Sequence, residues 1–284
     1  MSTRFPPPAA LLARLAGCLT LLATSATAHA DSLPLWEAGA GVATMSMPDY
    51  RGSDQRSVRN LPLPYLIYRG ERLKADRDGI RTMLFDSDRV ELNLSALGTL
   101  PSNSTDNLAR RGMPDLRPII ELGPALNFLL ARPDPHTKLE LRFPLRAAIS
   151  IDTPLRHAGW IFSPSLAWQS RSVAALPGWN LSASGGPVFQ DRRYNSVFYG
   201  VRQSEALPGR PAYAARGGYA GSHVTAGLSR RFSRFWVGAF MRYDHLGGAV
   251  FEDSPLIRSR NALTAGLGVS WIFGQSSTMV QADQ

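Results

Sequence analysis

Residues 261–273, NALTAGLGVSWIF, alternate between large apolar side chains and small or polar ones. Successive side chains of a β-strand point to opposite faces, so this alternation predicts a strand with one apolar face. That face consists of Leu263, Ala265, Leu267, Val269, Trp271 and Phe273. A tilted strand needs roughly 9–11 residues to cross a bilayer, and this segment is slightly longer. Residues 261–273 are therefore predicted to cross a membrane as a β-strand.

The same period of two recurs along the chain and predicts further strands. In the clearest example, residues 138–151, charged side chains alternate with leucine, phenylalanine and isoleucine. Other segments with this pattern are residues 35–43, 61–68, 90–96, 120–130, 160–169, 179–184 and 223–229. Residues 235–243 are ambiguous, because Trp236 and Phe240 would share a face with Arg242. Pro62 and Pro64 cannot donate to a strand ladder, so they are expected at a strand start, an edge or a bulge.

The connections alternate between short and longer ones. Residues 86–88, 131–137, 170–177 and 232–233 are short, residues 152–158 are of medium length, and residues 47–60, 100–117 and 190–216 are longer. Outer-membrane barrels have this asymmetry, with short periplasmic turns and longer outer loops. Eight strands fit between residues 90 and 273, and the N-terminal part adds four if residues 76–79 form a tight turn, or two if they do not. We predict an all-β, antiparallel transmembrane β-barrel of about twelve strands, with ten as the alternative.

The N-terminus has the pattern of a secretory signal. Arg4 and Arg14 precede an apolar run, and a small-residue tract ends at Ala28-His29-Ala30. We predict a signal peptide at residues 1–30, followed by a barrel domain at residues 31–284 with a short C-terminal tail at 275–284. The alternative is a lipoprotein lipidated at Cys18, because residues 15–18 match a lipidation box. If the signal is removed after residue 30, the mature chain contains no cysteine.

Composition agrees with a barrel without requiring one. Hydrophobic residues make up 44% of the chain and the mean hydropathy is −0.13, because the two faces of each strand cancel. A secreted soluble β-sandwich would also alternate, but its strands are usually near 5 or 6 residues long. The formal charge of +9 favours anionic partners. For an exported protein these are outer-membrane lipids and lipopolysaccharide, and no nucleic-acid partner is expected.

Motifs for catalysis, cofactors and metals are missing from the sequence. His136, His157, His223 and His245 have no metal-ligand spacing. Lipid A deacylases place a catalytic histidine and serine two residues apart near a strand end, but the residue two beyond His245 is Gly247. We therefore predict a protein that is not an enzyme and that binds no cofactor or metal.

Short motifs in order along the chain resemble the MltA-interacting protein (MipA/OmpV) family of outer-membrane proteins. The motifs lie at residues 39–41, 48–54, 61–65, 68–70, 198–201 and 253–256. The residues singled out in them, without an assigned role, are Asp49, Tyr50, Gly52, Ser53, Tyr199, Gly200, Asp253, Ser254 and Pro255.

The resemblance implies a location in the cell outer membrane of a Gram-negative bacterium. It also implies a scaffold or interaction protein for peptidoglycan (murein) synthesis and remodelling, with a lytic transglycosylase and a murein synthase as partners. The alternatives are a porin-like channel for small solutes and a surface adhesin. For a channel, the residues expected to line the lumen are Glu91, Glu121, Lys138, Glu140, Arg142 and Arg146.

Overall fold

The structure is a computed structural model that describes residues 32–70, 73–76, 79–171 and 176–281. The predicted signal peptide at residues 1–30, with Cys18, lies outside the described residues. So do residues 77–78, the centre of the predicted tight turn, and residues 282–284 at the end of the predicted tail.

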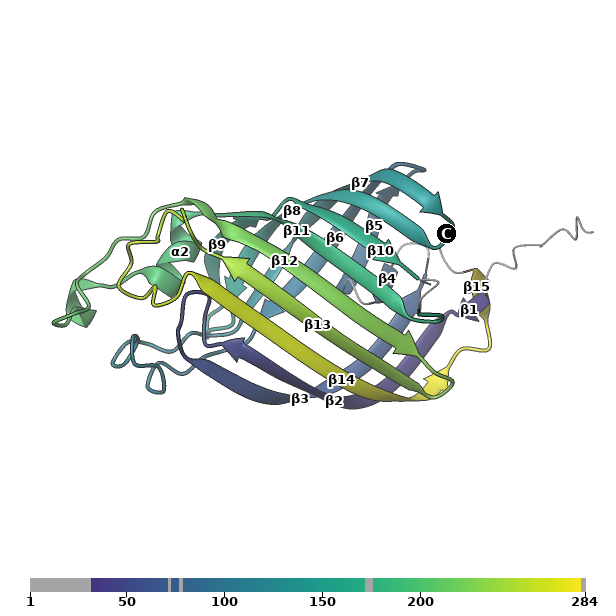
Figure 1. Ribbon diagram of the computed structural model, residues 1–284, viewed down its shortest axis with the longest axis horizontal. Coiled ribbons are helices and arrows are strands. Elements are labelled where there is room, and N and C mark those ends of the chain that lie inside the picture. The colour runs from purple at the N-terminus through teal and green to yellow at the C-terminus, as the bar shows by residue number, and fades with distance from the viewer. Residues whose placement is uncertain (1–31, 71–72, 77–78, 172–175, 282–284) are drawn as a thin grey trace, which may run out of the picture.

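Antiparallel strands form one large closed sheet (Figure 1). They are β2 (Trp36–Pro48), β3 (Arg56–Arg69), β4 (Leu73–Asp76), β5 (Gly79–Asp86), β6 (Val90–Thr99), β7 (Ile119–Asp134), β8 (Thr137–Ser150), β9 (Arg156–Phe162), β10 (Ser165–Ser170), β11 (Asn180–Gln190), β12 (Gly218–Arg231), β13 (Phe235–His245) and β14 (Asn261–Gln275). The ring closes where β14 pairs with β2. Because β9 and β10 each pair with both β8 and β11, they are two parts of one interrupted strand. The described residues thus form a twelve-stranded barrel, and the predicted fold class is confirmed.

The two ends of the barrel differ. At one end the connections are short, and the first and last described strands, β1 (Ser32–Pro34) and β15 (Met279–Gln281), pair there in a small sheet (Figure 1). At the other end the strands are joined by residues 49–55, 100–118, 151–155, 191–217 and 246–260. We call these the short-turn end and the long-loop end.

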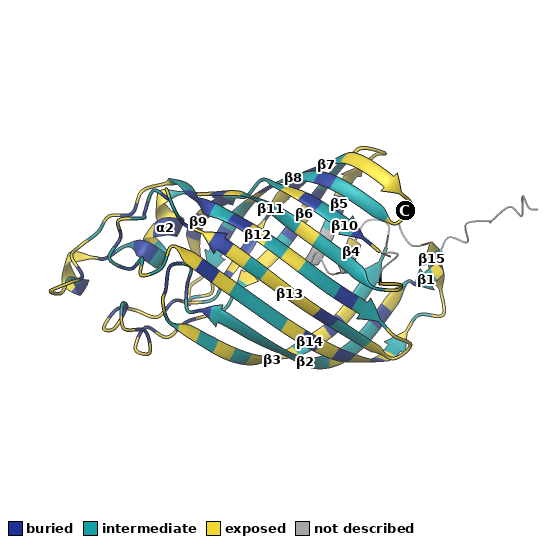
Figure 2. Cartoon of the chain, viewed as in Figure 1, coloured by how far each residue is buried: buried dark blue, intermediate teal, exposed yellow. Residues whose placement is uncertain are grey.

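The final strand shows which way the wall faces. On β14, Leu267 and Phe273 are 61% and 62% exposed, whereas Ser270 is fully buried and Ala262 is 4% exposed. Figure 2 shows the resulting alternation of exposed and buried positions along β14. The large apolar side chains point away from the barrel interior, as residues 261–273 predict for a membrane-facing strand.

Contacts inside the barrel settle which face of β13, the strand with the ambiguous pattern, points inward. The ring of Trp236 on β13 lies 6.0 Å from that of Tyr65 on β3, although β14 and β2 separate these strands in the sheet. Phe240 lies over Gly266, where an added Cβ would be 2.6 Å from the phenylalanine ring. Both aromatic side chains therefore fill interior space over small residues instead of facing lipid.

Two details of the predicted strands are corrected. The connection predicted at residues 47–60 is limited to residues 49–55, because the mostly polar residues Arg56–Asn60 pair with β2 in spite of their loop-like composition. The strand predicted at residues 160–169 is interrupted between β9 and β10, where Pro164 cannot donate a ladder hydrogen bond.

The prolines of β3 lie on an edge, as expected. β3 pairs with β2 along its whole length, but with β4 only at Tyr68 and Arg69. Pro62 and Pro64 thus lie where β3 has no second described neighbour, so no ladder on that side requires their missing N–H groups.

Candidate functional site

Four connections at the long-loop end fold together into a compact plug, which we define as residues 49–55, 100–118, 191–217 and 246–260. The plug contains the helix α2 (Arg192–Tyr199) and the single turn η1 (Gln203–Glu205). Its buried apolar residues include Tyr50, Met113, Leu116, Tyr194, Tyr199, Val201, Leu246, Phe251 and Leu256. They form one cluster with Ile119, Ala148, Ile161, Val188 and Ala220, which lie near the long-loop ends of five strands. The plug therefore packs against the inner surface of the barrel mouth (Figure 1).

Three of the family-motif residues meet in the centre of the plug although they are far apart in sequence. The Tyr50 hydroxyl donates to the Leu256 carbonyl oxygen at 2.6 Å. The Ser254 hydroxyl donates to the Tyr199 carbonyl oxygen at 2.7 Å, and the Tyr199 ring stacks on Phe251 with centroids 3.8 Å apart. These contacts join three connections into one body.

The turn at residues 49–53 supplies a second set of links. Gly52 has a φ of +105°, which favours glycine, and an added Cβ would lie 2.5 Å from Ile257. Its carbonyl oxygen accepts from the backbone N–H of Arg258 at 2.7 Å. The side-chain amide of Asn107 donates to Asp49 at 2.8 Å and to the Ser53 hydroxyl at 2.9 Å. Asn107 is fully buried, so these two acceptors keep its amide satisfied.

Helix α2 carries Tyr199 and ends at the motif residue Gly200. Its N-cap, Asp191, accepts from the Tyr194 N–H at 2.8 Å, and Gly200 ends the helix by donating to the Ser196 carbonyl oxygen at 3.2 Å. Asp253 is exposed and Pro255 is half-buried beside Ser254. The structure thus brings together most of the nine singled-out residues and leaves Asp253 at the surface.

Burial controls the ionisation of the plug tyrosines. Burial raises the pKa of Tyr199 to about 12, and it raises the pKa of Tyr50 and of Tyr194 well above the ordinary value near 10. All three hydroxyls therefore stay protonated and can donate hydrogen bonds. Tyr194 donates to Glu121 of β7 at 3.1 Å, which ties the helix to the wall.

Arg51 is the second tie between plug and wall, and it is not among the nine singled-out motif residues. Its Nε lies 3.0 Å from Asp244 of β13, and its Nη2 donates to the Ala220 carbonyl oxygen of β12 at 2.9 Å. Asp244 is 2% exposed and also accepts two 2.8 Å bonds from Arg242. The position of Arg51 inside the motif at residues 48–54 was the available signal, but its partner is remote in sequence.

A separate charged cluster crosses the barrel interior near the short-turn end. Glu37 of β2 is fully buried and pairs with Arg69 of β3 at 2.8 Å and with Arg231 of β12 at 2.6 Å. β12 is not a neighbour of β2 in the sheet, so the contact with Arg231 spans interior space.

The six residues proposed to line a channel lie on three neighbouring strands, β6, β7 and β8. On β8, Glu140 lies between Lys138 at 2.6 Å and Arg142 at 2.7 Å. The other three have different surroundings: Glu91 accepts from Asn93 and Asn127, Glu121 from Tyr194, and Arg146 donates to Ser95. On β8, ion pairs therefore join Lys138, Glu140 and Arg142 to one another.

The candidate catalytic and metal sites considered from the sequence involve histidine side chains. The ring of His245 bonds to Asn261 at 2.9 Å, and in the described chain it bonds to no serine hydroxyl. No three His, Cys, Asp or Glu side chains of the described residues group as a metal site would require. Among the same residues, no helix has the length and apolar character needed to cross a membrane.

These features define a class: a transmembrane β-barrel with an apolar outer surface and four outer connections that pack together at its mouth. The family model described as MltA-interacting protein MipA matches residues 40–273, and the chain belongs to this family. The family resemblance seen in the sequence is thus confirmed, and the protein resides in the outer membrane of a Gram-negative bacterium. The short-turn end is then periplasmic and the long-loop end is the outer end.

The chain is also similar to solved outer-membrane proteins. With an outer-membrane channel from Pseudomonas putida F1 it shares 12% identity over 87% of this chain and 98% of that chain, with a TM-score of 0.46. With outer membrane phospholipase A from Escherichia coli it shares 10% identity over 84% of this chain and 94% of that chain, with a TM-score of 0.33. With the N-terminal β-barrel domain of Pseudomonas aeruginosa OprF it shares 14% identity over 66% of this chain and 98% of that chain, with a TM-score of 0.27. The comparison with curated proteins gives no significant match.

Proposed function

We propose that this protein is a non-enzymatic scaffold of the outer membrane that holds periplasmic murein enzymes together. The partner class follows from the family, whose name describes an MltA-interacting protein. The resemblance of the sequence motifs implies a lytic transglycosylase and a murein synthase as the two enzymes. A scaffold needs an anchored barrel with an accessible periplasmic end, and it needs no open pore.

The plug is the observation that carries this proposal. One apolar cluster joins the four connections of the plug to the inner surface of five strands at the outer mouth. Ions cross membranes in hydrated form, so an apolar core in the mouth opposes a wide, permanently open channel. The barrel is in this respect better suited to anchoring than to conduction.

The periplasmic end offers the surface that such enzymes would contact. Arg230 lies over the rings of Phe232 and Trp179 at 4.9 and 5.9 Å, and the β1–β15 sheet lies beside the same end (Figure 1). Aromatic and arginine side chains are enriched at protein–protein contacts. This end therefore combines the correct compartment with suitable chemistry.

A small-solute channel is the second candidate, because the barrel interior is charged. Glu140 with Lys138 and Arg142 on β8 provides a polar path along one side of the interior. For this function the plug would have to open or leave a narrow passage beside it.

Two measurements on the full-length protein separate the candidates. Reversible cross-linking in intact cells, followed by purification of the barrel, tests for an attached lytic transglycosylase. Planar-bilayer recording tests for ion-permeable steps. Recovery of the transglycosylase without conductance supports the scaffold, whereas steady conductance without any murein enzyme contradicts it and supports the channel.

A matched variant sharpens the pull-down. Replacing Trp179 and Phe232 by alanine alters the periplasmic end, and replacing the exposed plug residue Leu108 by alanine alters the outer end. A scaffold that works through the periplasmic end loses enzyme recovery only in the first variant. A heat-dependent gel shift checks that both barrels are folded.

A further inference from the structure

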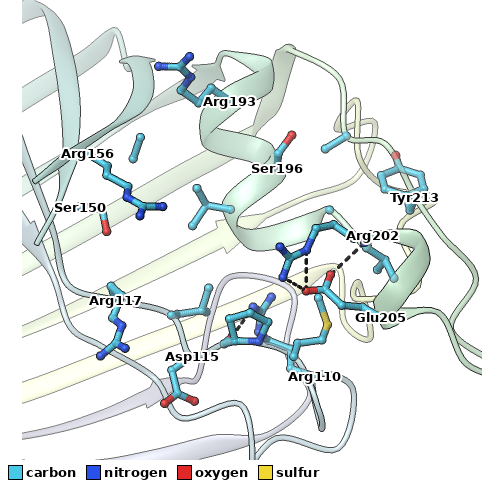
Figure 3. A pocket seen from close by; sticks show the side chains of 18 of the residues that line it. Arg110, Asp115, Arg117, Ser150, Arg156, Arg193, Ser196, Arg202, Glu205 and Tyr213 are labelled. Carbon is cyan, nitrogen blue, oxygen red and sulfur yellow. Dashed lines mark hydrogen bonds and ion pairs between the residues drawn. The ribbon is translucent and has the colours of Figure 1, made fainter. Parts of the chain in front are cut away.

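An open cavity of about 1010 Å³ lies at the outer mouth, between the plug and the hairpin of β8 and β9 (Figure 3). Helix α2 lines it with Arg193 and Ser196, and the β8–β9 hairpin lines it with Ser150 and Arg156. Arg117, in the connection before β7, completes this side. The volume is at the upper end of the range of about 300–1,000 Å³ that is typical of small-molecule sites.

The cavity contains five arginines, and three of them are already engaged. Arg110 is buried and donates to the carbonyl oxygens of Phe198 and Pro114 within the plug. Arg202 pairs with Glu205 at 2.5 Å. Arg117 lies 3.6 Å from Asp152, and its side chain is 63% exposed, so this pair is weak.

Arg156 and Arg193 have no carboxylate partner among the described residues. Both are exposed, and Figure 3 shows Arg156 directed into the cavity from β9. Arg193 bonds through Nη1 to the ring Nδ1 of His157 at 3.0 Å. That bond orients the guanidinium without neutralising its charge.

The acidic residues that line the cavity are held by other groups. Asp115 accepts from the Ser104 N–H at 2.7 Å, and Asp152 accepts from the Ser150 hydroxyl at 2.7 Å. The Arg202 side chain holds the pKa of Glu205 below its usual range, so that carboxylate remains ionised in its own pair. Five guanidinium groups thus line the cavity against three carboxylates, so its net charge is positive.

A net positive charge in a cavity attracts an anion. Arginine presents a planar fork of N–H donors that matches phosphate oxygens in two-bond geometry. The hydroxyls of Ser150 and Ser196 already donate to Asp152 and to the Arg192 carbonyl oxygen, and each keeps an acceptor lone pair for a sugar hydroxyl. The cavity is also far larger than a single phosphate ion requires.

We propose that this cavity binds a phosphate-bearing saccharide, with Arg156 and Arg193 as the phosphate ligands. At the outer mouth such a ligand has two sources: the phosphorylated core sugars of lipopolysaccharide, or a free sugar phosphate in the medium. The proposal is independent of the scaffold function, because the cavity and the periplasmic end lie at opposite ends of the barrel.

The test uses the purified full-length protein at low ionic strength, where electrostatic binding is strongest. In the first arm, calorimetry measures binding of glucose 1,6-bisphosphate, with glucose as the neutral control. In the second arm, immobilised protein is exposed to lipopolysaccharide with and without its core phosphates. Both arms compare wild type with the double variant R156Q/R193Q and with the matched control R111Q/R192Q.

The control removes the same charge from exposed arginines outside the cavity, and Arg192 is on the same helix. In at least one arm we expect phosphate-dependent binding that R156Q/R193Q weakens by about tenfold or more, because its charge-assisted bonds are lost. The control variant R111Q/R192Q should change this binding less than about twofold. Binding in the first arm identifies a soluble ligand, and binding only in the second identifies lipopolysaccharide. Absence of phosphate-dependent binding in both arms overturns the proposal, and so does an equal loss in the control pair. A heat-dependent gel shift verifies that each variant is folded.

Discussion

The wall and the plug of this barrel place their apolar side chains in opposite ways. In the wall, Leu267 and Phe273 point outward and are more than half exposed in the isolated chain. In the plug, Phe251 and Leu256 point inward and are fully buried. The wall therefore depends on lipid to cover its apolar surface, whereas the plug has a water-excluding core of its own. Each region should accordingly respond to a different kind of substitution.

The largest effect is expected for Phe251→Ala in the plug. The substitution removes a fully buried ring that stacks on Tyr199, and such changes cost about 3–5 kcal/mol. We expect the plug to open while the barrel remains folded. Limited proteolysis should then cut residues 191–217, with an unchanged heat-dependent gel shift. Loss of the gel shift together with protease resistance would mean that wall and plug are not separable.

A charged side chain on the outer face of the wall should instead destabilise the barrel itself. Leu267 lies in the middle of β14 and is 61% exposed, and arginine at the bilayer midplane costs about 2–4 kcal/mol. Leu267→Arg should lower folding yield into lipid vesicles, as measured by denaturant titration. Thr264→Arg, on the inner face of the same strand, is the control and should be tolerated better. Equal losses for the two variants would contradict the assignment of faces.

A smaller effect is expected for Tyr50→Phe. The variant keeps the ring but leaves the Leu256 carbonyl oxygen without its 2.6 Å donor, at a cost of about 1–3 kcal/mol. Hydrogen exchange or proteolysis of residues 246–260 should accelerate by the factor that this loss of free energy implies. Tyr243→Phe, which removes a hydroxyl from the exposed end of β13, should leave that rate unchanged.

The smallest effect is a loosening of the plug in alkali. The raised pKa values of the plug tyrosines mean that the closed plug keeps protons that an opened plug loses from about pH 10 upward. Their contribution to stability is therefore complete below pH 10 and falls as the pH rises through the folded pKa of Tyr199, about 12. Ultraviolet absorbance of tyrosinate should rise together with protease cleavage of the plug. If the tyrosines ionise at pH 10 while the plug stays closed, they do not stabilise it by burial.

Sequence reasoning succeeded for the wall because a strand repeats every two residues. The alternation in residues 261–273 correctly predicted both the strand and its outward face, and the connection lengths correctly predicted two unlike ends. The prediction was wrong for Arg56–Asn60. Their composition resembles that of a loop, but they pair with β2 and extend β3. Local composition cannot report a hydrogen-bonded neighbour that is remote in sequence.

The plug could not be predicted in the same way. The motif residues Tyr50, Tyr199 and Ser254 were recognised, but nothing in their spacing indicated that they touch. Connections have no periodicity, and contacts between them depend on where the barrel places their ends. Arg51 and Asp244 illustrate this, because they are far apart in the chain and only 3.0 Å apart in the fold.

By itself, then, the sequence determined the family and with it the compartment, the barrel class and the two faces of most strands, because short motifs and a period of two are local properties of the chain. Only the tertiary structure decided that the outer connections form a plug, that Glu37 pairs with Arg231 across the interior, and that Arg156 and Arg193 share a cavity. These features depend on closing β14 against β2, which brings distant segments around one axis.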